Sequence, residues 1–183
     1  MIVYIIIIAA LLILVWIFIT YNKLIKDRNH ISEAWSGIDV QLKRRHDLIP
    51  NLADAVKGYS LHEKKLLEDI TEKRAKSTNT NVLSEKAIAE SDISGIFRNL
   101  IVLAENYPDL KASTNFLEFQ KQLVEVEDHL QYARRYFNGT VRDYNIRVES
   151  FPGNIIAGIF NFRPKDFFEI TLATEKQTPQ VEL

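Results

Sequence analysis

The sequence predicts an all-α protein, with an N-terminal transmembrane helix that continues into an antiparallel, up-and-down helical bundle of three long helices and a short C-terminal one. Three observations support this prediction. An apolar run opens the chain, and the apolar residues after it recur at alternating spacings of three and four. The 183 residues include only 6 Gly and 5 Pro, too few for a many-turned β-sandwich.

The opening run, residues 2–20, reads IVYIIIIAALLILVWIFIT, and the first charged side chain after it is Lys23. About 20 apolar residues in a helix span a hydrocarbon core of about 30 Å. Aromatic residues stand near both ends of the run, at Tyr4, Trp16 and Tyr21, as expected of interfacial anchors. A cleaved signal peptide would instead need a basic start, a shorter apolar core and small residues at its end. We therefore expect an uncleaved membrane anchor over residues 1–22.

Positive charge follows the apolar run. This flank contains three basic residues, Lys23, Lys26 and Arg28, and one acidic residue, Asp27. Because Lys and Arg are enriched on the cytoplasmic side of membrane spans, the pattern predicts an N-terminus outside and a cytoplasmic bundle.

The first bundle helix is predicted from a heptad seam typical of a coiled coil. The seam comprises Leu24, Arg28, Ile31, Trp35, Ile38, Leu42, Arg45, Ile49, Leu52, Val56, Tyr59, Glu63, Leu66 and Ile70. It predicts a helix of about 50 residues, or about 75 Å, that continues out of the membrane. Pro50 predicts a kink or break near Ile49, because proline removes a helical hydrogen bond.

Turn-like residues divide the remaining chain. The polar stretch 77–81 (STNTN) should separate the first helix from a second over 82–106, which Tyr107-Pro108-Asp109 ends. The third helix should run from Phe116 to Phe151, where Phe-Pro-Gly-Asn stops it. Residues 155–162 (IIAGIFNF) predict a last helical turn that contacts either the core or the membrane. The predicted domains are an anchor (1–22), a bundle (23–170) and a flexible tail (171–183).

Composition argues against several classes of function. The formal net charge is −1, and cysteine is absent, so neither a nucleic-acid footprint nor a thiolate site is indicated. Neither a Gly-rich phosphate loop nor a Gly-x-Ser-x-Gly motif occurs, and no Glu-x-x-His precedes any of the 4 histidines. We expect no catalytic activity, cofactor, metal or small-molecule ligand, and no nucleic-acid partner.

Arg45 is unusual because it occupies an apolar seam position. Its stem could pass along the core with the guanidinium in water. Alternatively, it could pair with a buried carboxylate from another helix, with Glu105 and Glu127 as candidates, and so fix helix register. Tyr136, Tyr144 and Asn145 are similarly expected to make structural hydrogen bonds rather than ligand contacts.

Three segments carry a family resemblance: RRHDLIPNLADAVKGY at 44–59, AENYPDLKAS at 104–113, and YARRYFNGTVRDYNIRVESFPGNIIAGIFNF at 132–162. Together with the apolar run they closely resemble the LemA family of bacterial membrane proteins. The matching positions are Arg44, Arg45, Asp47, Leu48, Ile49, Pro50, Asn51 and Leu52; then Glu105, Tyr107, Pro108 and Leu110; then Ala133, Arg134, Tyr136, Val141, Tyr144, Asn145, Phe151 and Pro152. Phe137-Asn138 departs from the family pattern, which has Tyr-Asn there.

The resemblance implies a single-pass protein of a bacterial cell membrane, with a cytoplasmic bundle and no established catalytic residues. The matching residues are then fold determinants: Pro50 and Pro108 set breaks, and Arg45, Tyr144 and Asn145 set polar register. We expect a scaffold that self-associates at the membrane, because a tether to the bilayer makes weak lateral contacts effective. The alternatives are a monomeric adaptor for another membrane protein, or a membrane-shaping or stress-related protein that uses residues 155–162 as a second lipid contact.

Overall fold

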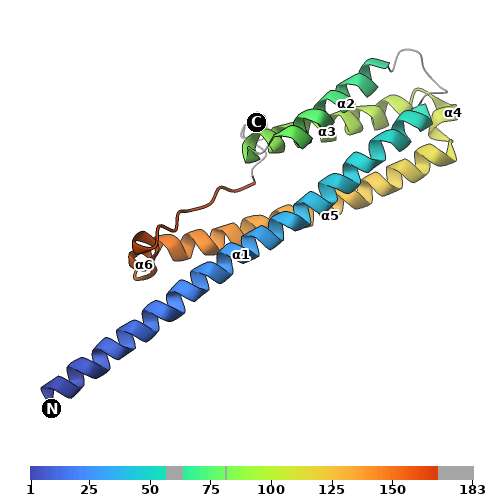
Figure 1. Ribbon diagram of the computed structural model, residues 1–183. Coiled ribbons are helices and arrows are strands. Elements are labelled where there is room, and N and C mark those ends of the chain that lie inside the picture. The colour runs from blue at the N-terminus through green and yellow to red at the C-terminus, as the bar shows by residue number, and fades with distance from the viewer. Residues whose placement is uncertain (57–63, 81, 169–183) are drawn as a thin grey trace, which may run out of the picture. The chain divides into compact units, whose positions relative to one another are not determined.

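The computed structural model describes residues 1–56, 64–80 and 82–168, and all regular secondary structure in these ranges is helical (Figure 1). The helices are α1 (Ile2–Val56), α2 (Lys64–Asn79), α3 (Leu83–Ala104), α4 (Pro108–Lys111), α5 (Thr114–Glu149) and α6 (Gly153–Ile159). The all-α class is therefore confirmed. The described residues form two compact units, one from Met1–Val40 and Gln131–Phe167, the other from residues within Gln41–Leu130 together with Phe168.

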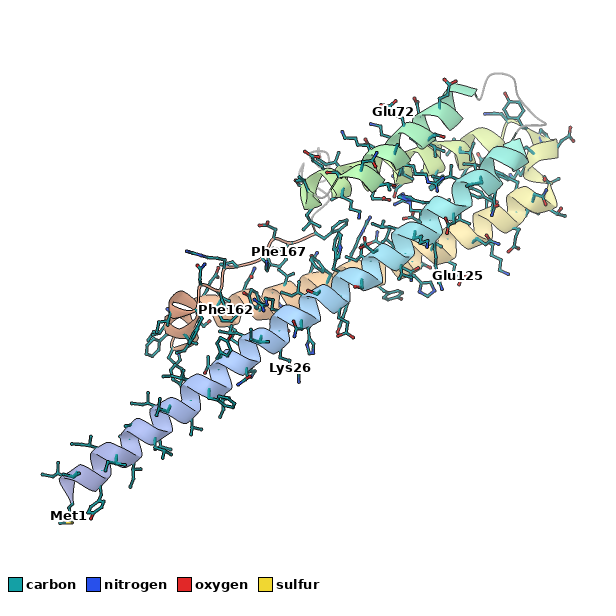
Figure 2. The ribbon with its side chains drawn as sticks, viewed as in Figure 1. Met1, Lys26, Glu72, Glu125, Phe162 and Phe167 are labelled. Carbon is teal, nitrogen blue, oxygen red and sulfur yellow. The ribbon has the colours of Figure 1, made fainter. Side chains whose placement is uncertain are left out.

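The first unit contains the apolar half of α1, which is long and apolar enough to cross a membrane by length and composition. Between Met1 and Lys26, side chains project from α1 on all sides (Figure 2). The heptad seam then becomes buried against α5. Its buried members are Leu24, Ile31 and Ile38 from α1, facing Phe137, Val141, Tyr144 and Val148 from α5. Trp35 and Phe137 join the two helices edge to face, with ring centroids 5.6 Å apart.

The short helix α6 closes the first unit. Ile156 and Ala157 are its buried residues. The Tyr21 ring of α1 lies 4.8 Å from the Phe160 ring and 5.8 Å from the Phe162 ring, measured between centroids. The helical turn predicted within 155–162 is thus present, and it rests on α1 just after the apolar run.

The second unit is an up-and-down arrangement in which α1, α2, α3 and α5 alternate in direction (Figure 1). Apolar side chains from all of these helices and from α4 form one core. The core comprises Leu48, Ile49, Leu52, Ile70, Ile93, Phe97, Leu100, Ala104, Leu110, Phe116, Phe119, Leu123 and Val126. Phe97 and Phe119 meet edge to face, with ring centroids 5.8 Å apart. The burial of these apolar faces against one another stabilises the helices more than intrinsic helix propensity does.

Three boundaries differ from the sequence prediction. The seam predicted to continue in one helix to Ile70 is divided, because α1 ends at Val56 and Ile70 belongs to α2. Pro50 lies inside α1, which remains helical to Val56, so of the predicted kink or break near Ile49 the break is absent. The reason is that Leu48, Ile49 and Leu52 are all buried in the core and hold the helix on both sides of the proline. The polar stretch beginning at Ser77 was expected to be a turn, but its first three residues belong to α2. The predicted tail, 171–183, lies outside the described residues.

Candidate functional site

The second unit encloses an ion cluster centred on Arg45, whose side chain is 0% exposed. The guanidinium Nη1 lies 3.1 Å from Oε2 of Glu90 on α3, whose side chain is also fully buried. Nη2 donates to the Glu90 carbonyl oxygen at 3.0 Å and to the Ser94 hydroxyl at 2.5 Å. The guanidinium carbon also lies 5.6 Å from the centroid of the Phe97 ring. Arg45 thereby ties α1 to a full turn of α3.

A second acidic residue approaches Arg45 from α5. Oε1 of Glu127 lies 3.1 Å from Nε of Arg45, although the two atoms are not aligned as a hydrogen bond. The Glu127 side chain is 29% exposed and therefore keeps contact with water. Burial lowers the pKa of Arg45, while the charges of Glu127 and Glu90 raise it in part. Because an arginine stays protonated in proteins, the buried cation is balanced by carboxylates from two different helices.

The other Glu90 oxygen is bound as well. His46 Nε2 lies 2.8 Å from Glu90 Oε1, and the Ser77 hydroxyl donates to the same oxygen. The His46 nitrogen must carry its proton here, since an ionised carboxylate can only accept. Burial by itself would raise the pKa of Glu90, but the hydrogen bonds from His46 and Ser77 and the charge of Arg45 together hold that pKa below its usual value. Glu90 is therefore a buried carboxylate with partners on α1 and α2.

The cluster decides between the two interpretations of Arg45. A guanidinium in water is excluded, and pairing with a carboxylate from another helix is confirmed. Of the two expected partners, Glu127 pairs, whereas Glu105 is exposed.

Glu90 was missed by the sequence analysis, although a signal was present. The apolar seam of α3 runs Ile93, Phe97, Leu100, Ala104 at spacings of four and three, and one step back along it is Glu90. An acidic residue at an apolar position of one helix complements a basic residue at an apolar position of another.

The first unit holds a second set of polar contacts. Arg147 of α5 donates through Nε to Asp27 of α1, and both side chains are largely buried. Asn145 of α5 donates from Nδ2 to the Lys165 carbonyl and accepts the Lys165 backbone N–H at Oδ1, each at 2.8 Å. This pair of hydrogen bonds holds the segment after α6 to α5.

The motif tyrosines behave differently from expectation. Tyr144 is buried, and burial raises the pKa of its hydroxyl, with Arg28 opposing this and Asp27 adding to it. Tyr136 is 59% exposed. Neither hydroxyl hydrogen-bonds to another described residue. Their positions on α5 explain this, because Tyr144 faces the apolar seam and Tyr136 faces outward.

The remaining motif residues lie in the interior, at the start of α4 or on the surface. Tyr107 packs against the core of the second unit, Arg134 is buried in the first, and Pro108 stands at the start of α4, where its missing N–H costs nothing. Asn51 lines a hollow of about 290 Å³ beside Phe119. The motif residues on the surface are Arg44, Asp47, Pro50, Asn51, Glu105, Phe151 and Pro152.

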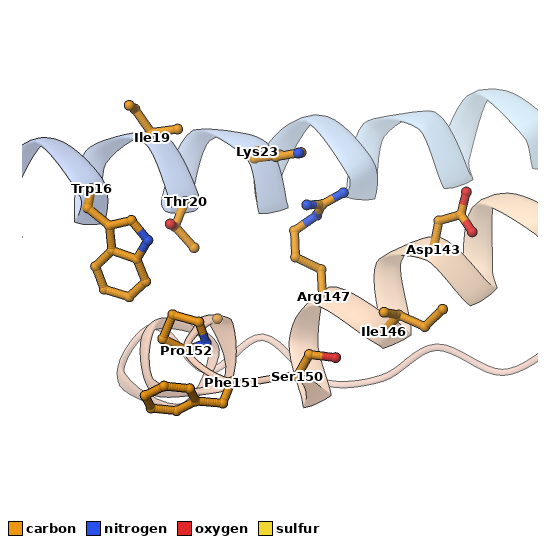
Figure 3. A pocket seen from close by; sticks show the side chains of 11 residues that line it. Trp16, Ile19, Thr20, Lys23, Asp143, Ile146, Arg147, Ser150, Phe151 and Pro152 are labelled. Atoms are coloured by element: carbon orange, nitrogen blue, oxygen red, sulfur yellow. The ribbon is translucent and has the colours of Figure 1, made fainter.

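A larger cavity, of about 400 Å³, lies in the first unit between α1 and the corner where α5 ends (Figure 3). Trp16, Ile19 and Thr20 form one wall, and Phe151 and Pro152 form the other. The walls are mainly apolar, and Trp16 and Pro152 face each other across the gap (Figure 3). Among the described residues, no group of three or more His, Cys, Asp and Glu side chains is placed to hold a metal ion.

These features define a class of protein: a membrane-associated helical bundle with one apolar helix and buried ion pairs at its helix contacts. Within that class the chain belongs to the LemA family, whose sequence model matches residues 34–183. Protein LemA of Metamycoplasma hominis is 32% identical over 137 residues, which cover 74% of this chain and 63% of that protein. The chain thus spans less than two thirds of that relative's length.

More distant relatives carry a different name. The magnetosome protein MamQ 2 of Paramagnetospirillum magneticum is 20% identical over 175 residues, covering 81% of this chain and 64% of that protein. The magnetosome protein MamQ of Magnetospirillum gryphiswaldense is 21% identical over 189 residues, covering 88% of this chain and 70% of that protein. With the apolar α1, these relatives support a membrane-associated protein of LemA type.

Proposed function

We propose that this chain is a non-catalytic scaffold, anchored by one span in a bacterial cell membrane, that self-associates through the outward face of α5. The observation that carries the proposal is a set of large apolar side chains left exposed along that helix. Within the first unit they are Tyr132, Tyr136 and Ile146.

Helix geometry places these residues on one side. At about 100° per residue, the three positions fall within a sector of about 80°, opposite the buried face that carries Phe137, Val141 and Tyr144. Charged residues lie on the same face, among them Arg135, whose guanidinium lies 4.7 Å from the centroid of the Tyr132 ring. An exposed face that mixes aromatic, aliphatic and charged side chains is suited to a weak contact with another molecule.

A second copy is the occupant that the anchor favours. Anchored copies lie parallel and at one depth in the bilayer, so the same stripe on two neighbours is presented at matching height. Confinement to the membrane raises the effective concentration, and a modest apolar contact then suffices. Charged residues within the stripe, such as Arg135 and Arg142, suit such a contact better than an obligate interface. The basic flank after the span supports a cytoplasmic bundle.

The test is the mass of the full-length protein in a mild detergent or a nanodisc. The monomer weighs 21.2 kDa, and we expect a discrete multiple of that mass. A variant with Tyr132→Glu and Tyr136→Glu should fall to the monomer mass while its circular dichroism is unchanged. Val102→Glu is the matched control, because Val102 of α3 is 61% exposed against 64% for Tyr132, and it should keep the assembly.

A monomeric wild-type protein would contradict self-association. The same stripe would then be the candidate surface for the alternative, an adaptor that recruits another membrane protein, and crosslinking from position 132 would identify that partner.

A further inference from the structure

The corner between α5 and α6 exposes an unusual amount of apolar surface for a segment so short. Phe151 is 80% exposed and Ile159 is 69% exposed, and Ile155 and Phe160 are each about half exposed. The opposite side of α6, formed by Ile156 and Ala157, is buried in the first unit. The segment is therefore apolar on both sides, which is not the pattern of a helix that faces water.

The neighbours of this corner place it at the depth of the membrane boundary. A hydrocarbon core of about 30 Å accommodates about 20 helical residues, so a core entered at Ile2 is left near Tyr21. Phe151 lines the same cavity as Trp16 and Ile19, which belong to the last turns of the apolar run (Figure 3). The Phe160 ring rests on Tyr21 itself. The exposed apolar side chains thus lie alongside the end of the span.

The charges around the corner suit the same location. Residues 21–28 and 145–166 carry six basic side chains (Lys23, Lys26, Arg28, Arg147, Arg163 and Lys165) and three acidic ones. The whole chain has a net charge of −1. Positive charge is therefore concentrated where the first unit meets the headgroups, and bilayers with anionic lipids attract such a region.

We propose that residues 151–160 form a second membrane contact, which inserts into the interface of the leaflet where the α1 span ends. The occupant of the exposed face, and of the cavity between Trp16 and Phe151, is phospholipid. Phe151, Ile155 and Ile159 lie among the upper acyl chains, and the basic side chains face the headgroups. The first unit is then fixed to the bilayer at two places, through a transmembrane helix and an interfacial one.

The experiment uses the full-length chain in vesicles of phosphatidylcholine with a minor fraction of phosphatidylglycerol. Because the chain contains no cysteine, Phe151→Cys and Ile159→Cys each provide a unique site for an environment-sensitive fluorophore. We expect blue-shifted emission at both sites, with quenching by lipids that carry a nitroxide near the headgroup and weaker quenching by lipids that carry it near the bilayer centre. Ile8→Cys, in the middle of the span, should show the reverse order.

Val40→Cys is the matched aqueous control, because this exposed residue belongs to the same unit but lies about five helical turns beyond Tyr21 along α1. Its label should be unaffected by either nitroxide. Red-shifted, unquenched emission at 151 and 159 would overturn the proposal. Blue-shifted emission without lipid quenching would also overturn it, because a second protein copy would then cover the corner. The outcome is independent of the mass measurement, so this proposal and the scaffold can fail separately.

Discussion

Arg45 and Glu90 meet at 3.1 Å with neither side chain exposed to water. The two residues are 45 positions apart in the sequence and belong to different helices. Each occupies an otherwise apolar position in the seam of its own helix. A buried charge pair of this kind contributes little net stability compared with a well-packed apolar pair. Its effect is to favour one register of α1 against α3, because any other register would leave two charges buried without partners.

Removal of one charge of the Arg45–Glu90 pair should therefore lower the free energy of unfolding substantially. We expect Arg45→Met to lower the free energy of unfolding by about 3–5 kcal/mol, because Glu90 remains buried without its cation. Arg44→Met, at the exposed neighbouring position, should change it by less than about 0.5 kcal/mol. Denaturant unfolding followed by circular dichroism measures both. If the two variants unfold alike and with the same cooperativity, the register argument is wrong.

The double variant Arg45→Met with Glu90→Met separates charge balance from packing. It should recover part of the stability that Arg45→Met loses, since the fully buried carboxylate is gone and Glu127, which also loses its cation, is 29% exposed. The double-mutant cycle gives the coupling directly. Additive effects of the two substitutions would show that the pair is not coupled.

Stability should fall in acid through Glu90. Its pKa in the folded protein lies below the ordinary value of about 4.3. The folded state therefore binds the proton less readily than the unfolded state. The resulting stabilisation is complete above pH of about 4.3 and is lost as the pH falls through the lower, folded-state pKa.

Unfolding curves between neutral and acidic pH measure this loss. Glu90→Gln should be less stable at neutral pH and should show a shallower decline below pH of about 4.3. Glu105→Gln, in which the altered carboxylate is exposed, should follow the wild-type profile. An unchanged acid profile in Glu90→Gln would assign the decline to other carboxylates.

Asn145 is expected to hold the segment after α6 through its amide. Asn145→Asp removes the N–H that the Lys165 carbonyl accepts and places an oxygen there instead. We expect faster hydrogen exchange at the Lys165 amide and a loss of about 0.5–1.5 kcal/mol in local stability. Asn154→Asp, at an exposed position in α6, makes the same chemical change and should leave the Lys165 amide protected. Equal exchange in both variants would contradict the assignment.

Pro50 should be replaceable because α1 is helical on both sides of it. Pro50→Ala restores the N–H that proline lacks and should raise the free energy of unfolding by about 1–3 kcal/mol. Pro108→Ala, at the favourable first position of α4, should have a small effect of opposite sign. Destabilisation by Pro50→Ala would mean that the bundle requires a distortion at this position.

Much of this fold can be predicted from the spacing of apolar residues. The seam from Leu24 to Leu52 and the seam from Phe116 to Val148 are buried almost position by position, because an amphipathic helix has one way to remove its stripe from water. The sequence predictions that the structure contradicts concern positions where local helix-ending residues are opposed by tertiary packing. Pro50 and the polar stretch at Ser77 each predict a helix end when only neighbouring residues are considered. The buried neighbours of Pro50 keep that segment helical, and the hydrogen bond from Ser77 to Glu90 does the same for the polar stretch.

The helical class, the apolar span and the unusual position of Arg45 can all be predicted from residue spacing, and the family from its motifs. The carboxylates that pair with Arg45, and the side chains that stay exposed at the corner of α5 and α6, become known from the folded arrangement. The difference is one of range, because hydrophobic periodicity is a property of residues three or four apart. The partner of a buried charge and the neighbours of an exposed apolar side chain are set by helices that meet only after folding.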